Sequence, residues 1–212
     1  MRRCIFCQKP SNRSRSVEHI IPESLGNKEH ILPCGVVCDK CNQYFGTKIE
    51  KPLLESYYFK HARFRTETSS KKGRIPSIRG FLLPTGLEVE FFIDKDGYRS
   101  IGAHSDEARW IKHLYTHKNG KIVMPIPKYP DKKLVSRFLG KVALETLANH
   151  LVEEDGWLEY IATDPQLDML RNYTRFGNGP SFWPFHRRRI YPEDSIFTDG
   201  TEWYEVLHES AL

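Results

Sequence analysis

Two pairs of cysteines near the start of the chain constrain its fold more than any other feature. The first pair is Cys4 and Cys7, the second is Cys38 and Cys41, and two residues separate the members of each pair. Each pair presents two thiolates from one tight turn, and zinc closes structural sites with four such ligands in a tetrahedron. The spacing therefore predicts one structural zinc ion that holds two turns together, with the intervening segment as an insertion between them.

Redox chemistry is the main alternative for these thiols. A thioredoxin-like motif needs one pair at the end of a strand in a βαβ pattern, which the sequence lacks. No apolar segment typical of a signal peptide follows the opening residues, so we expect a cytoplasmic protein whose cysteines stay reduced. The fifth cysteine, Cys34, is expected to be a small buried side chain near the second pair.

The basic residues of the chain are clustered, and this favours a nucleic-acid partner. The chain has 212 residues, a net charge of +5, and no apolar stretch long enough to span a bilayer. Basic side chains that neutralise phosphates supply sequence-independent affinity, although a solvated basic face is the plain alternative. The clusters comprise Arg2, Arg3, Lys9, Arg13 and Arg15; then Lys60, Arg63, Arg65, Lys71, Lys72, Arg74 and Arg79; and finally Arg187, Arg188 and Arg189.

The segment around the cysteine pairs predicts the order β-β-α. Two short apolar runs, 17–21 and 31–37, read as strands. Asp39 is placed to cap a helix in which Phe45, Ile49 and Leu53 recur on one face.

The remainder of the chain predicts a mixed region, so the fold class is α+β. A polar segment, 66–77, is expected to be a loop or linker. Strands are expected at 80–93 and 98–103, joined by a turn at 94–97. Helices are expected at 107–115 and from 132 until Gly156 stops the second one, and Asp164-Pro165 is expected to open a further short helix. The tail after Gly177 is expected to be irregular or an edge strand. In the helix from 132, the expected apolar stripe is Leu134, Phe138, Val142, Leu147 and Leu151.

An acid, a histidine and an amide occupy positions that suit phosphodiester hydrolysis. Glu18 and His19 lie between the cysteine pairs, and Asn42 follows the last cysteine directly. A zinc that closes the pairs would draw the strand with Glu18 alongside the start of the helix with Asn42. Their oxygens are the hard ligands that Mg²⁺ or Mn²⁺ prefers, and His19 could remove a proton from an attacking water.

These motifs resemble those of the HNH (ββα-metal) endonuclease family, in the zinc-stapled branch that includes phage junction-resolving endonuclease VII. The resemblance covers about a quarter of the chain, and the Glu18-His19-Ile20-Ile21-Pro22 segment is typical of the family. It implies that His19 is the general base, that Glu18 and Asn42 bind the catalytic Mg²⁺ or Mn²⁺, and that DNA is the substrate, with RNA as an open alternative. The expected division is an HNH module at 1–58, a basic linker at 59–79, and an α+β region at 80–212 that could bind nucleic acid or oligomerise.

One position departs from the family pattern. The family's middle Asn, which braces the loop and the catalytic histidine, falls on Pro33, so Asn27 or His30 would have to substitute for it. This departure supports the alternative of an inactive zinc-stapled nucleic-acid-binding module. Glu50, on the same helix as Asn42, is interpreted as a solvated residue, with metal ligation as the alternative. The residues expected to contact the nucleic acid are Arg13, Arg15, Lys48, Arg63 and Arg65.

Overall fold

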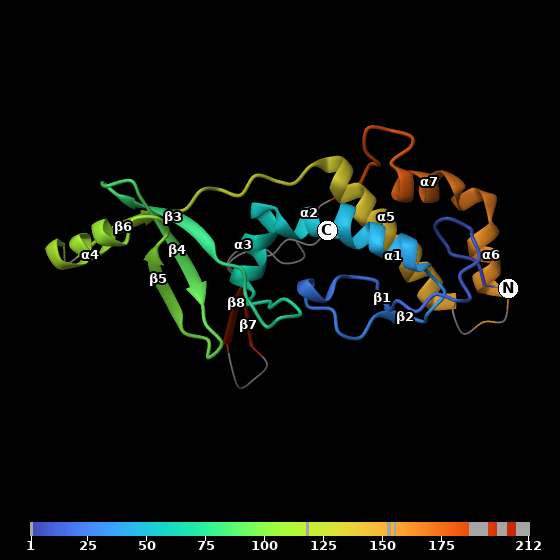
Figure 1. Ribbon diagram of the computed structural model, residues 1–212, viewed down its shortest axis with the longest axis horizontal. Coiled ribbons are helices and arrows are strands. Elements are labelled where there is room, and N and C mark those ends of the chain that lie inside the picture. Colours follow the sequence, from blue (N-terminus) through green and yellow to red (C-terminus); the bar gives the residue numbers. More distant parts are fainter. Residues whose placement is uncertain are drawn as a thin grey trace.

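The N-terminal part of the chain forms the expected β-β-α unit (Figure 1). In this computed structural model, the described residues are 2–117, 119–151, 154 and 156–186, together with the backbone of 195–198 and 203–206. Strand β1 (Glu18–His19) pairs antiparallel with β2 (Ile31–Leu32), and a 3₁₀ turn, η1 (Glu23–Leu25), lies between them. Both strands are shorter than expected, because Pro22 and Pro33 end the pairing soon after it begins.

A single helical segment carries the α part of this unit. It consists of α1 (Asp39–Phe45), one π turn η2 (Gly46–Glu50) and α2 (Lys51–Glu55), with right-handed helical backbone at each junction. Phe45, Ile49 and Leu53 are fully buried, which confirms the predicted face. The predicted cap is wrong: Cys38 is the N-cap residue, and the Asp39 carboxylate instead accepts hydrogen bonds from the backbone of Arg15 and Ser16.

Ser56 ends this segment and starts the next one. Its extended backbone breaks the helix, and its hydroxyl accepts a hydrogen bond from the Phe59 amide as the N-cap of α3 (Tyr57–Arg65).

A four-stranded antiparallel sheet follows, in the order β5-β4-β3-β6. The strands are β3 (Ile78–Leu83), β4 (Leu87–Ile93), β5 (Arg99–Ala103) and β6 (Lys121–Val123), and α4 (Glu107–Thr116) joins β5 to β6. The single strand expected at 80–93 is wrong. Pro84, Thr85 and Gly86 form a turn there, with Gly86 at φ +66°, and β3 and β4 pair across it.

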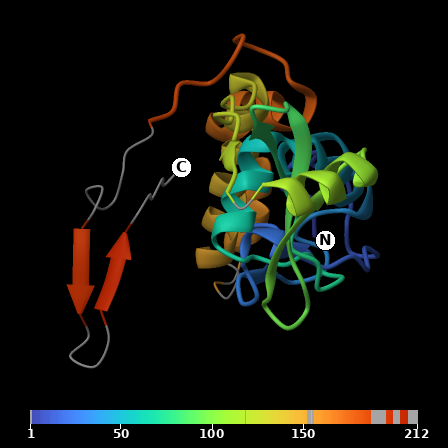
Figure 2. The same cartoon turned by 90° about the vertical axis from the view of Figure 1, so that its left-hand side faces the viewer.

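The C-terminal helices pack on the β-β-α unit, whereas the four-stranded sheet lies at the other end of the molecule (Figure 1). In Figure 2, which looks along the long axis from that end, the sheet lies in front of the helices. The C-terminal helices are α5 (Lys132–Leu151), α6 (Trp157–Thr163), the 3₁₀ turn η3 (Pro165–Leu167) and α7 (Asp168–Phe176). One hydrophobic core contains residues from both parts, including Phe45 and Ile49 with Val135, Phe138 and Leu144. The α+β class is therefore confirmed.

The buried face of α5 differs from the predicted stripe. Leu147 is 38% exposed, whereas Lys141 and Glu145 are fully buried. Charged side chains are rarely buried unless they are paired, so this face indicates an internal ion-pair cluster.

The last part of the chain is only partly described. Residues 177–186 are irregular, and β7 (Ser195–Thr198) pairs with β8 (Trp203–Val206). The predicted basic cluster Arg187–Arg189 lies outside the described residues. Among the helices of the described part, none is long and apolar enough to cross a membrane.

Candidate functional site

The four paired cysteines converge on one point. Their sulfur atoms all lie within 4.8 Å of one another, and the Cys7 and Cys38 sulfurs are 3.6 Å apart. The Cys38 amide donates a hydrogen bond to the Cys4 sulfur at 3.3 Å. Within the described part of the chain, no other group of three or more His, Cys, Asp or Glu side chains converges in this way.

The charge that four adjacent thiolates would carry favours a bound cation at this cluster. Hydrogen bonds with the Cys38 thiol, together with burial, raise the pKa of the Cys4 and Cys41 thiols, because four adjacent thiols cannot all ionise unaided. A zinc ion would supply the missing charge, and four sulfur ligands at this separation fit it. Arg175 of α7 adds a further positive group, since its Nε lies 3.2 Å from the Cys41 sulfur.

Cys34 does not belong to the cluster, and its predicted burial is wrong. The side chain is exposed, and its sulfur lies 3.6 Å from the Arg15 carbonyl oxygen. The next residue, Gly35, adopts φ +91°, and this turn directs the chain back toward the second cysteine pair.

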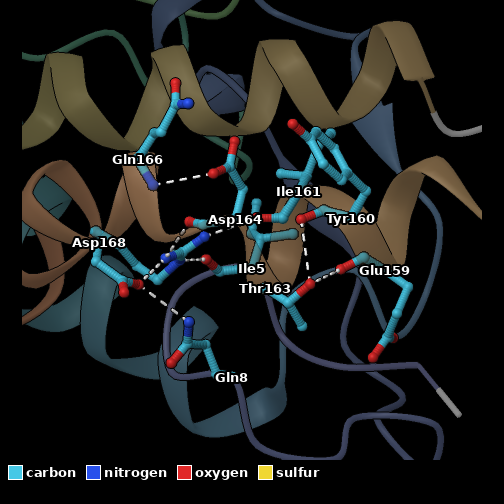
Figure 3. A network of polar contacts seen from close by, with 10 residues as sticks. Ile5, Gln8, Glu159, Tyr160, Ile161, Thr163, Asp164, Gln166 and Asp168 are labelled. Carbon is cyan, nitrogen blue, oxygen red and sulfur yellow. Dashed lines mark hydrogen bonds and ion pairs between the residues drawn. The ribbon is translucent and has the colours of Figure 1, made fainter.

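The C-terminal helices hold the first cysteine turn in place. Arg171 of α7 is 2% exposed, and it donates to the carbonyl oxygens of Ile5 and Ile161 at 2.7 Å each. Gln8 donates to Asp168 at 3.1 Å, as Figure 3 shows. Arg171 and Arg175 are therefore structural parts of the interface between α7 and the cysteine turns.

Beside the cysteine cluster, a cleft of about 440 Å³ gathers the predicted acid, histidine and amide. Glu18 and His19 come from β1, Asn42 from α1 and Glu50 from the π turn, and all four line this cleft. The interpretation of Glu50 as a solvated residue is wrong, because its side chain is 17% exposed and lies 2.8 Å from the buried Lys141 ammonium.

In the part of the chain that the structure describes, Glu18 has a partner on only one of its two carboxylate oxygens. Its Oε1 lies 2.7 Å from Lys141 Nζ, whereas its Oε2 is buried without a hydrogen-bond partner among the described residues. Burial raises the pKa of Glu18, and the nearby Lys141 charge opposes that shift.

The histidine and the amide are held by the strand and the loop around them. The Asn42 amide nitrogen donates to the Val17 carbonyl oxygen at 2.9 Å, which ties α1 to the residue before β1. His19 Nδ1 is buried, and no residue of the described chain forms a hydrogen bond with it.

Asn27 braces the loop between β1 and β2. Its amide nitrogen donates to the carbonyl oxygens of Ile21 and His30 at 2.8 and 3.0 Å. Its amide oxygen accepts from the Glu29 and His30 amides at 3.2 and 2.9 Å. Of the two residues considered as substitutes for the middle Asn, Asn27 makes these contacts with its side chain, whereas the His30 side chain is exposed.

Basic side chains form the rim of the cleft, but most differ from those predicted to contact nucleic acid. Arg63, one of the residues predicted to contact nucleic acid, lines the cleft and is buried, whereas Arg65 lines a separate apolar pocket against the sheet. Arg13, Arg15 and Lys48 are exposed and do not line the cleft. The segment expected to be a linker folds back over it, where Lys71 pairs with Glu23 at 3.4 Å. The remaining basic residues of the rim are Lys51, Lys60 and Lys72.

Comparison with known protein families identifies the class of this module. Residues 4–58 match the model of the HNH endonuclease family, so this part of the chain, which contains the four clustered cysteines and Glu18, His19, Asn42 and Glu50, is an HNH-type module. The match covers about a quarter of the chain. Comparisons of the chain with curated proteins and with solved structures find no match.

Proposed function

We propose that the protein is a metal-dependent HNH endonuclease that hydrolyses phosphodiester bonds in DNA. The observation that carries the proposal is the single cleft in which Glu18, His19 and Asn42 meet under a rim of basic side chains. The family match to residues 4–58 supports the same reaction class.

The donor atoms of the cleft fit a hard divalent cation such as Mg²⁺ or Mn²⁺. Glu18 Oε2 is a buried carboxylate oxygen with no hydrogen-bond partner in the described chain. The hydrogen bond from the Asn42 nitrogen to Val17 orients the amide, so its oxygen is the atom that remains for a metal. Glu50, on the same cleft wall, is a candidate third oxygen ligand. A metal bound there would stabilise charge that develops on the phosphate and on the leaving oxygen.

His19 is proposed as the general base. It lines the cleft next to Glu18, on a strand that is fixed by β2 and by the Asn27-braced loop. In this role one ring nitrogen removes a proton from the water that attacks phosphorus. Lys60 and Lys72 on the rim, together with Arg63 in the cleft wall, would hold the phosphates of the backbone, which gives affinity with little sequence preference.

The second candidate is a zinc-stapled module that binds nucleic acid without cutting it, and Pro33 at the position of the middle Asn favours it. The contacts of Asn27 weaken that argument, because they provide the loop bracing from a neighbouring position.

A plasmid assay distinguishes the two candidates. With Mg²⁺ or Mn²⁺, wild type should nick or linearise supercoiled DNA, whereas His19→Ala should bind DNA and leave it uncut. His30→Ala is the matched control, because it removes an exposed histidine from the loop between β1 and β2, and it should retain cleavage. Binding without cleavage by wild type, at normal zinc content, would support the second candidate instead.

A further inference from the structure

The ammonium group of Lys141 is buried among oxygen atoms, which belong to the HNH-type module and to Glu145 of its own helix. Its Nζ lies 2.7 Å from Glu18 Oε1, 2.8 Å from Glu50 Oε1 and 3.0 Å from Glu145 Oε2. It also donates to the backbone carbonyl oxygens of His19 and Ile20, at 2.9 and 3.3 Å. The side chain has no exposed surface.

This contact joins two distant parts of the chain. Glu18, His19 and Glu50 lie within the matched residues 4–58, whereas Lys141 lies in the middle of α5. Burying an ammonium is costly unless charges and hydrogen bonds compensate for it, and here carboxylates and carbonyls of the module provide both. The module thus contains the cleft carboxylates Glu18 and Glu50, but the cation that pairs with both of them comes from outside the module.

We propose that Lys141 is a positioning residue of the nuclease centre, which fixes the Glu18 carboxylate and the backbone of His19 in the arrangement that binds the catalytic metal. The inference rests on the proposed function, and it assigns the α5 helix to the same active site.

The two oxygens of Glu18 show how this works. Lys141 holds Oε1, so the carboxylate cannot rotate freely, and the buried Oε2 is left for a metal. Glu50 is held in the same way and also lines the cleft. Glu145, the third partner, is fully buried and does not line the cleft. Residues behind a metal ligand orient it and tune its affinity, and Lys141 is placed to do so for two carboxylates.

The decisive variant removes the cation together with its buried partner on the same helix, so Glu145 is not left as an unpaired charge, while Glu18 and Glu50 lose the ammonium. In Lys141→Met/Glu145→Leu, an apolar pair replaces the buried ion pair, a change that proteins often tolerate. Glu145→Leu alone is the matched control, because it keeps the contact between Lys141 and Glu18. Lys132→Met, on the exposed start of the same helix, controls for loss of a lysine from α5.

Two measurements test the role in the full-length protein: Mn²⁺ affinity by electron paramagnetic resonance without DNA, and kcat and KM for plasmid cleavage. We expect the double variant to be folded and to bind Mn²⁺ about 10- to 100-fold more weakly, with a similar fall in kcat and an unchanged KM. Both control variants should resemble wild type. A folded double variant with wild-type or tighter Mn²⁺ binding overturns the positioning role.

If the double variant does not fold, Lys141→Arg replaces it. The guanidinium keeps the charge, but its planar fork cannot reproduce the contacts of the ammonium, so a smaller loss of kcat and Mn²⁺ affinity is expected. Unchanged values in folded Lys141→Arg would contradict the inference. A wild type that neither binds Mn²⁺ nor cuts DNA would refute the proposed function and this inference together, whereas an active wild type with an equally active double variant refutes only the role of Lys141.

Discussion

Arg171 is expected to stabilise the contact between α7 and the first cysteine turn, and Arg171→Met tests this. Methionine keeps most of the buried stem but loses the two hydrogen bonds at 2.7 Å to the Ile5 and Ile161 carbonyl oxygens. Each buried carbonyl left unpaired costs about 1–3 kcal/mol, so the variant should lose about 4 kcal/mol of stability. For a chain of this size that corresponds to a fall in Tm of about 10 °C.

Thermal unfolding followed by circular dichroism measures the loss, and zinc release to a chromophoric chelator localises it. Ile5 lies between Cys4 and Cys7, so release of zinc should be faster in the variant. Arg3→Met is the matched control: its pair with Glu159 is about half exposed on both sides and should contribute less than about 1 kcal/mol. The reasoning would be refuted if Arg171→Met lowered the Tm by less than about 2 °C, or if the two variants lowered the Tm equally.

Three further outcomes are expected. Asn27→Ala should remain folded but lower kcat by about 10- to 100-fold, because the loop beside His19 loses its brace; an unchanged kcat in steady-state cleavage assays would contradict this. Burial raises the pKa of Glu145 in the folded state above the value of about 4.5 in the unfolded chain. Between these two pKa values the folded state binds a proton that the unfolded chain has released, so the stability of the fold should fall as the pH rises through this range. Melting curves at several pH values should show a flatter decline for Glu145→Gln, and parallel curves would show that this carboxyl does not contribute. Elemental analysis should find about one zinc per chain in wild type and much less in Cys41→Ser, which should also lose the fold of the module.

The sequence predicted the parts of the site whose chemistry is local. A cysteine pair defines two metal ligands within one turn, and the Glu18-His19 dipeptide places two functional groups on one short strand. The position of Asn42 follows from the same logic, since closing the two cysteine pairs brings the start of α1 next to that strand.

Lys141 could not be predicted in this way. It lies four residues before Glu145 on a helix, and such a pair usually indicates an exposed ion pair on a solvated face. Its burial depends on carboxylates from segments more than ninety residues away, which no local pattern contains. The prediction of a single strand at 80–93 was wrong for a simpler reason, because the run of apolar residues was given more weight than the turn at Pro84–Gly86.

The π turn that links α1 and α2 sets the rotational phase between Asn42 and Glu50. Eight residues of ideal α-helix would separate the two side chains by about 80° around the axis, whereas one residue absorbed by the wider turn reduces the offset to about 20°. This smaller offset allows both side chains to face the cleft, and both residues line it. Deleting one residue of Gly46–Glu50 would leave the four cysteines unchanged and yet turn every side chain beyond it by about a quarter of a turn. The geometry of this centre is therefore sensitive to helix length, independently of the chemistry of its residues.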